Sequence, residues 1–319
     1  MVSAFSAVDF FLIPGERRDF DNFLNNTMET ETFLRRPKDI IQPLPDGAVL
    51  LDYGPMHMVI RAYDGEIPRV DWATEGARVA VRLLEDQVRF LPLIKQKAHT
   101  LEIQPEYPDV VRRMIDSTRK MGEPDLTPLA AVAGAASDAV ADFLISRGGT
   151  KIMVDNGGDI ALRLRGSEVA RVGVKTDIYA KSPAYVIPID AGSGVGGVAT
   201  SGFGGRSFTK GIASAATILS ANASLADAAA TVVGNFTNVE DPGIARSRAE
   251  AIYPDTDIAG EWVTTGVGTL PAEKIEEALQ NGLKKAHALY VRGLIRGALI
   301  AVRPRVAWTS SLDSWVRRL

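Results

Sequence analysis

The sequence contains no cysteine and only three histidines among its 319 residues, and both shortages exclude chemistry. Without cysteine there can be no disulfide, no thiolate-bound zinc, no iron–sulfur cluster and no thiol nucleophile. The three histidines, His57, His99 and His287, are far apart in the chain and do not show the HExxH spacing of zinc proteases. A histidine-rich metal site is therefore not expected.

Long apolar runs are also missing. No stretch of about 18 apolar residues occurs, and the first residues carry no positive charge and are interrupted by Asp9. The pattern therefore predicts neither a membrane span nor a signal peptide, and we expect a cytoplasmic protein. Hydrophobic residues make up 46% and charged residues 24% of the chain, which is typical of a globular protein.

A strong charge of one sign is absent as well. Thirty-six basic and 39 acidic residues leave a net charge of −3, which gives no overall attraction for nucleic acid. Residues 284–319 carry eight basic residues and one acidic residue, so +7. No aromatic-rich motif accompanies this basic segment, so we interpret it as a solvated face. The expected partner is a small-molecule cofactor or nucleotide, and the sequence does not determine the oligomeric state.

The order of predicted elements favours an α+β fold. Four prolines interrupt residues 1–45, which we predict to be an irregular arm before one domain over residues 46–319. Strands and helices mix without a regular βαβ alternation. Thr127 and Ser224 are the predicted N-caps of two helices. The predicted strands cover residues 48–53, 56–63, 151–155, 159–165, 169–175, 184–189, 215–219 and 293–302, and the predicted helices cover 73–95, 108–121, 129–146, 224–233, 244–251 and 272–290.

Two glycine-rich stretches carry the main binding signals. Asn156, Gly157 and Gly158 follow a predicted buried strand, which is typical of a type I′ hairpin turn and also of a backbone that approaches a ligand closely. Residues 192–211 contain eight glycines, and their formal G-x-G-x-x-G is followed by no helix. We therefore interpret the second stretch as a turn or a loop that covers a ligand.

A carboxylate and a hydroxyl are spaced one helical turn apart in the predicted helix over residues 224–233. Asp227 and Thr231 therefore share one face of that helix. Their oxygen atoms suit Mg²⁺ or Ca²⁺ when backbone carbonyls and waters complete the shell. The alternative is an ordinary packing helix in which Asp227, near the N-terminus, interacts favourably with the helix dipole.

These segments occur in an order that resembles the ApbE-type flavin transferase superfamily, over roughly residues 127–236. That superfamily shows a K-G-x-x-x-D helix segment, a strand ending in N-x-G-G-D, a central S-G and an A-D-x-x-x-T helix. The matching segments here are 130–138, 155–160, 199–202 and 225–231. The chain is most similar to a branch of ApbE-like proteins that lacks the transferase hallmarks.

The resemblance implies a mixed sheet-and-helix domain that holds FAD or FMN with Mg²⁺ and moves FMN to a target protein. It implies that Asp227 and Thr231 bind the metal, with a backbone carbonyl from near Gly134 or Ala135. It further implies that the nucleotide pocket is lined by Gly134, Asn156, Gly157, Gly158, Ser201 and Gly202.

Two departures from the superfamily pattern weaken the case for FMN transfer. Ala133 stands where the superfamily has lysine, and the H-I-I-D-P-x-T-G segment is missing, so no histidine lies between His99 and His287. Only Lys210 and Arg206 could face a phosphate nearby, and we interpret both as solvated loop residues. No catalytic residue can be assigned. The sequence thus predicts an ApbE-like protein that binds a phosphorylated or aromatic cofactor of flavin or pterin type in a glycine-lined cleft. The alternatives are an FMN transferase and a non-catalytic binding or scaffolding protein in one-carbon cofactor metabolism.

Overall fold

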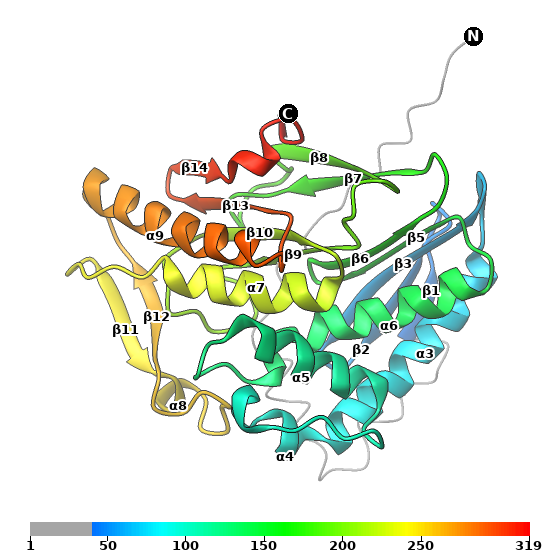
Figure 1. Ribbon diagram of the computed structural model, residues 1–319, viewed down its shortest axis with the longest axis horizontal. Helices are drawn as coiled ribbons and strands as arrows, with labels where there is room; N and C mark the ends of the chain where they lie inside the picture. The colour runs from blue at the N-terminus through cyan, green and yellow to red at the C-terminus, as the bar shows by residue number, and fades with distance from the viewer. Residues whose placement is uncertain (1–39) are drawn as a thin grey trace.

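The computed structural model describes residues 40–319, so most of the predicted arm lies outside the described residues (Figure 1). Strand β1 occupies residues within the last part of that arm, and the boundary at residue 45 stays a prediction. The strands are β1 (Ile41–Pro43), β2 (Val49–Tyr53), β3 (Met56–Asp64), β4 (Ile67–Pro68), β5 (Lys151–Asn156), β6 (Asp159–Leu164), β7 (Val169–Val174), β8 (Tyr185–Asp190), β9 (Gly197–Ser201), β10 (Ala215–Ser220), β11 (Ile244–Arg248), β12 (Trp262–Val267), β13 (Gly297–Val302), β14 (Arg305–Trp308) and β15 (Arg317–Arg318). The helices are α3 (Val70–Arg89), α4 (Leu91–Ile94), α5 (Asp109–Met121), α6 (Val132–Ser146), α7 (Ala223–Phe236), α8 (Ala249–Ile252) and α9 (Ala272–Val291), with short 3₁₀ turns such as η4 (Pro128–Ala131).

One large sheet runs through the described part of the chain in the order β1-β2-β3-β5-β6-β9-β10-β13-β14, with β4 paired to β3. Every pairing in it is antiparallel. A three-stranded sheet, β15-β8-β7, and a two-stranded sheet, β11-β12, complete the strands. An antiparallel sheet with separate helices is an α+β fold, so the predicted fold class is confirmed.

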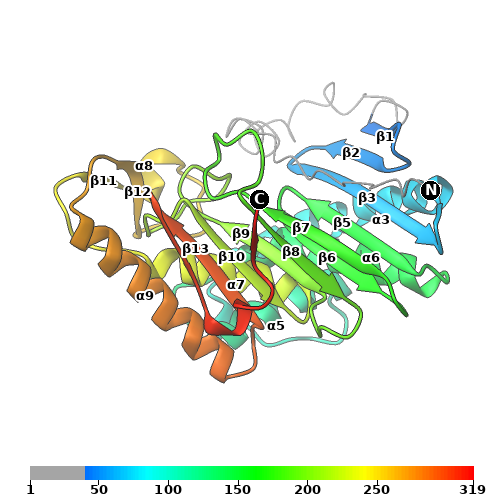
Figure 2. The same cartoon turned by 90° about the horizontal axis from the view of Figure 1, so that it is seen from above.

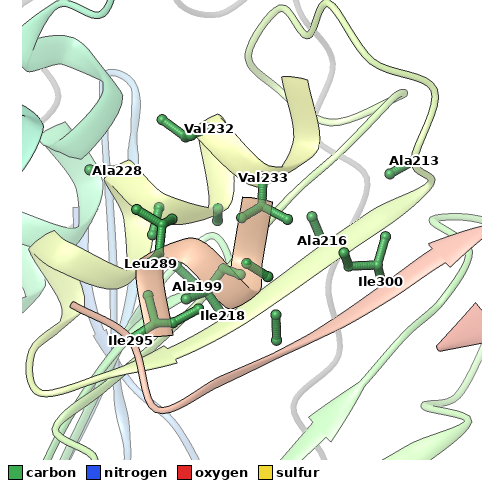
Figure 3. Packing of buried hydrophobic residues seen from close by; sticks show 14 of the residues in the cluster. Ala199, Ala213, Ala216, Ile218, Ala228, Val232, Val233, Leu289, Ile295 and Ile300 are labelled. Carbon is green, nitrogen blue, oxygen red and sulfur yellow. The ribbon is translucent and has the colours of Figure 1, made fainter. Parts of the chain in front are cut away.

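The elements form four layers (Figures 1 and 2). Helices α3, α6, α7 and α9 cover one face of the large sheet, and α5 packs outside α6 and α7. The small β7–β8–β15 sheet packs on the opposite face through buried residues such as Val172 and Ile187. Figure 3 shows the core between the sheet and helices α7 and α9, where Val233 lies near Ala216 and Leu289 lies near Ile218 and Ile295. Short side chains at this layer let the helices approach the strands closely.

Helix α6 and the turn before it include the one segment of residues 40–319 that is long and apolar enough to cross a membrane, Pro128–Ser146. Half of its most apolar window is buried inside the fold. It packs against α3, α5, α7 and the strands β5 and β6, which explains its apolar composition as that of a core helix. The cytoplasmic location stays a prediction.

The structure corrects several local predictions. The segment predicted as a helix over residues 244–251 is strand β11 followed by the single helical turn α8. Part of the stretch interpreted as a glycine-rich turn or loop, residues 192–211, is strand β9. Helix α7 is capped by Asn222, whose side chain accepts from the Leu225 N–H, and not by Ser224. Thr127 does lie at the N-cap position, but its hydroxyl hydrogen-bonds Asp257 instead of the helix.

Candidate functional site

The N-termini of α6 and α7 are joined by two carboxylates that each cap the other helix. Asp227 of α7 accepts the Gly134 N–H at the start of α6 (2.9 Å). Asp138 of α6 accepts the N–H groups of Ala223 (3.0 Å) and Ser224 (2.8 Å) at the start of α7. The first N–H groups of a helix have no hydrogen-bond partner within that helix, and each carboxylate accepts such N–H groups from the other helix. Each carboxylate also lies at the positive end of the other helix's dipole. This exchange fixes the crossing of the two helices.

The crossing is so close that only glycine fits at position 134. A Cβ there would lie 2.3 Å from the Ala223 carbonyl oxygen and 2.8 Å from the Asp227 Cβ. The predicted binding residue Gly134 and the predicted metal ligand Asp227 are therefore in direct contact, although 93 positions separate them in the chain. Thr231 lies one turn further along α7 and is half-buried.

The glycine turn after β5 is a two-residue hairpin. Asn156 pairs with Asp159, and Gly157 and Gly158 both have positive φ angles of 69° and 104°. Such angles are typical of a type I′ turn and favour glycine. The Gly158 N–H donates to the Asp155 carboxylate (2.8 Å), so it is already occupied. The hairpin prediction is confirmed; the turn's contact with a ligand stays a prediction.

The charges of Asp227 and Asp155 act on the carboxylate of Asp159, which follows this turn. Burial raises the pKa of Asp155, although the Gly158 N–H and the charges of Arg61, His57 and Arg206 oppose the shift. Burial, and then the negative charges of Asp227 and Asp155, hold the pKa of Asp159 well above its usual range. The Asp159 carbonyl accepts the Ser137 hydroxyl of α6 (2.8 Å), which ties the turn to the helix crossing.

Burial, assisted by the nearby charge of Asp138, raises the pKa of Asp227 to about 7, against the opposing N–H groups of Gly134 and Ala133. A cation placed among these carboxylates would favour their charged forms.

Ser201 and Gly202 lie at the same edge of the sheet. Strand β9 pairs with β6 through Ile160 and Val198, and continuing this antiparallel register places Ser201 beside the turn. A Cβ at Gly202 would lie 2.6 Å from the Ser214 carbonyl oxygen, so two backbones cross there. A small cavity of about 20 Å³ lies behind the turn, between the two sheets. The structure thus gathers all the segments predicted to form the site.

The two cations considered from the sequence separate in space. Arg206 lies over the turn: a Cβ at Gly157 would be 3.5 Å from its Nη1, which also donates to the Pro55 carbonyl (3.1 Å). Lys210 instead forms ion pairs with Asp125 and with Glu261 (2.7 Å) and is only 21% exposed. Its interpretation as a solvated residue is therefore wrong, because two carboxylates fix it away from the turn.

Three residues near the turn were not among those predicted from the sequence: Asp155, Asp159 and His57. Asp155 and Asp159 flank the glycine turn and were visible in the same motif. His57 reaches the site because β3 pairs with β5, with Met58 opposite Asn156. The predicted hairpin contained His57, but no local pattern indicated which strand would lie beside it.

Among residues 40–319, no three histidine, aspartate or glutamate side chains are grouped closely enough to hold a metal by themselves. Asp227 has one oxygen, Oδ2, engaged with the Gly134 N–H. A cation at this edge would therefore need oxygen ligands from outside the carboxylate set, such as a hydroxyl, a backbone carbonyl, water or a phosphate.

The raised pKa of Asp227 predicts a pH dependence of stability. Its ordinary value is 3.8 and its folded value is about 7, so the folded state binds more protons between these pH values. This contribution to stability is complete below about pH 4 and is lost as the pH rises through about 7. We expect Asp227→Asn in metal-free buffer to remove this decline, measured as the free energy of unfolding in urea from pH 4 to 8.

Asp71→Asn is the matched control. The Arg69 guanidinium hydrogen-bonded to Asp71 lowers the pKa of that carboxyl, so its contribution is lost only as the pH falls below the ordinary value. Asp71→Asn should leave the profile between pH 5 and 8 unchanged. An identical decline in the wild type and Asp227→Asn would contradict the assignment of the raised pKa to Asp227.

Comparison with known proteins finds relatives in sequence and a similar solved structure. A UPF0280 protein of Methanosarcina barkeri is 31% identical over 204 residues, which cover 63% of this chain and 77% of that protein. A UPF0280 protein of Methanosarcina acetivorans is 34% identical over 188 residues, covering 58% of this chain and 69% of that protein. A variant of the flavin transferase ApbE from Vibrio cholerae aligns with a TM-score of 0.46 and 14% identity, over 82% of this chain and 96% of that chain.

The family model described as AbpE bacteria matches residues 41–309, a span that includes the helix crossing, the glycine turn and all of the large sheet. A match over this much of the chain, together with the two methanogen relatives, confirms the resemblance drawn from the motifs. The protein is therefore ApbE-like and belongs to the AbpE bacteria family.

Proposed function

We propose that this protein binds a phosphorylated or aromatic cofactor of flavin or pterin type, together with Mg²⁺, where the β5–β6 turn meets the start of α7. The observation that carries the proposal is that burial, and then the charges of Asp227 and Asp155, raise the pKa of Asp159 beside the turn. A divalent cation would relieve this repulsion, and Arg206 over the turn supplies a second positive group for a phosphate.

The donor set fits Mg²⁺. This ion prefers oxygen ligands and is commonly held by one or two carboxylates, with waters and substrate phosphates completing the shell. Asp227, whose Oδ2 accepts the Gly134 N–H, would be the charged ligand, and Thr231 would add a hydroxyl from the next turn. When bound, Mg²⁺ would polarise the phosphate groups of the cofactor. Gly157 and Arg206 would hold the phosphate side of the cofactor against the turn.

Transfer of FMN requires a group that accepts a proton from the acceptor hydroxyl. Ala133 provides no lysine, and the Nδ1 atom of His57, the histidine that β3 brings to this edge, lies 3.6 Å from the Asp52 carboxylate. We therefore propose binding without FMN transfer, and the transferase and the scaffolding protein remain the two alternatives.

The metal is tested by thermal unfolding with FAD or FMN and with or without Mg²⁺. At a free ligand concentration of 100 times Kd, binding adds about 2.7 kcal/mol to stability, which raises the midpoint by several degrees. We expect Asp227→Ala and Asp227→Asn to abolish the Mg²⁺-dependent part of this rise. Thr231→Val should reduce it by a smaller amount, because the hydroxyl is lost while the shape is kept.

Glu66→Ala, at an exposed position far from the turn, is the control for general charge effects. An undiminished Mg²⁺-dependent shift in both Asp227 variants would remove Asp227 from the metal site. Mass spectrometry of an ApbE-type acceptor protein incubated with FAD, Mg²⁺ and this protein decides the reaction. A covalent FMN adduct would establish the transferase, and the absence of both an adduct and any ligand-induced shift would favour the scaffolding protein.

A further inference from the structure

A second cavity of about 610 Å³ lies away from the glycine turn, between the C-terminal half of α7, α9 and the loop before η4. Its volume is within the range of small-molecule binding sites, roughly 300–1,000 Å³. None of the residues predicted from the sequence to bind cofactor or metal lines it. The lining residues are Glu123, Asp125, Leu126, Lys210, Val232, Asn235, Phe236, Asn238, Asn281, Lys284, Lys285 and Ala288.

The cavity and the glycine-turn site use different faces of α7. At about 100° per residue, Val232 and Phe236 lie about 140° and 180° around the helix from Asp227. Asp227 points to the start of α6, whereas Val232 and Phe236 line the cavity beside α9. The cavity is therefore a separate site and not an extension of the first.

An exposed aromatic ring forms one wall of the cavity. Phe236 is 41% exposed, although it ends a helix whose other apolar residues are mostly buried. The Lys285 ammonium lies 4.4 Å from the centre of its ring. Leu126, Val232 and Ala288 add apolar surface nearby. A planar ring that stacks on Phe236 would cover this exposed surface.

Amide groups offer both a donor and an acceptor. The Asn235 side-chain oxygen accepts from the Lys210 N–H (2.9 Å) and the Thr209 hydroxyl (3.3 Å), which leaves its amide nitrogen as the group presented to a ligand. Asn281 donates its amide nitrogen to the Asn238 carbonyl (3.5 Å), which leaves its side-chain oxygen as an acceptor. A donor and an acceptor near an aromatic wall match the edge of a nucleobase.

Of the three lysines that line the cavity, two form ion pairs with acidic residues. Lys210 is paired with Asp125 and Glu261, and Lys285 is paired with Glu123. Lys284, the neighbour of Lys285 on α9, is exposed, and no ion pair to it occurs within residues 40–319. Lys284 is therefore the cation available to one anionic group of a ligand.

We propose that this cavity binds a nucleoside monophosphate. The base would stack on Phe236 and pair with Asn235 and Asn281, and the phosphate would meet Lys284. This site is independent of the proposed cofactor site, because it lies on a different face of α7.

Isothermal titration of the full chain with AMP and GMP, and with adenosine and guanosine as uncharged probes, tests the proposal. We expect at least one monophosphate to bind, and its nucleoside to bind about fivefold more weakly because it lacks the charge that meets Lys284. Phe236→Ala should weaken binding about tenfold through loss of stacking. Lys284→Gln should reduce monophosphate affinity to that of the nucleoside and leave nucleoside affinity unchanged.

Lys274→Gln is the matched control, because it removes one positive charge from the same helix outside the cavity. It should bind like the wild type. Two results would overturn the proposal: no binding of either monophosphate at millimolar concentration, or undiminished binding in both Phe236→Ala and Lys284→Gln. The Asp227 variants report on the other site, so failure there and failure here are distinguishable.

Discussion

Adding a single methyl group at Gly134 is expected to lower the free energy of unfolding by about 3 kcal/mol. The new Cβ of Gly134→Ala would lie 2.3 Å from the Ala223 carbonyl oxygen, a backbone atom that cannot rotate away. The helices would have to separate, which also breaks the hydrogen bond from the Gly134 N–H to Asp227. Overpacking costs about 1–3 kcal/mol, and a hydrogen bond to a charged group contributes about 1.5–3 kcal/mol. Urea denaturation measures the loss.

Gly76→Ala is the matched control, because it adds the same methyl group to another buried helix. The nearest atoms to a Cβ at Gly76 are the side-chain ends of Leu144 (3.1 Å) and Val140 (3.2 Å), which can shift by a few tenths of an ångström. The gain in helix propensity from glycine to alanine, about 1 kcal/mol, offsets that adjustment. We expect Gly76→Ala to change stability by less than about 1 kcal/mol. Similar losses in the two variants would show that the helix crossing at Gly134 is not specially constrained.

Local sequence patterns predicted the elements that have strong internal signals. The β2–β3 hairpin, the helix α5 with Gly122 at its end, and the long helix α9 all lie where the periodicity placed them. Strand β11 was predicted as a helix because alanine, arginine and glutamate favour helices. It is a strand because it pairs with β12, more than 10 residues further on, and the sequence analysis did not predict β12. Helix propensity is weak compared with such a tertiary pairing.

In the candidate site, too, features set by neighbouring residues were predictable from the sequence, whereas contacts between residues far apart in the chain were not. The glycine turn was recognisable because Gly157 and Gly158 follow a buried strand. Only the family resemblance implied that Gly134 and Asp227 lie near one another, through a shared metal, since no periodicity relates residues 93 positions apart. Arg206 and Lys210 looked equivalent in the sequence, and their separation depends on the acidic partners that Asp125 and Glu261 provide to Lys210. Such pairings are set by the packing of loops and are not encoded in a short segment.

Replacing the other capping carboxylate, Asp138→Ala, is expected to cost about 3–5 kcal/mol and to loosen the whole helix crossing. The Asp138 side chain is completely buried, and it accepts the N–H groups of Ala223 and Ser224 and a hydrogen bond from Arg163 (3.0 Å). Its removal leaves the buried N–H groups of Ala223 and Ser224 without a partner. It also removes one of the two carboxylates that pair with the largely buried Arg163 guanidinium.

Asp142→Ala, one turn further along α6, is the control that separates these effects. Asp142 also binds Arg163 (2.7 Å), and it binds Arg113 (2.7 Å) as well, but its side chain is 38% exposed and it caps no helix. Water can replace much of what this variant loses, so we expect a cost of about 1 kcal/mol. Urea denaturation of both variants gives the comparison. Because Asp138 also sets where Asp227 lies, Asp138→Ala should weaken any Mg²⁺-dependent stabilisation, whereas Asp142→Ala should leave it intact. Equal costs for the two variants would mean that the ion pairs to Arg163 and Arg113, and not the capping of α7, hold the two helices at the site.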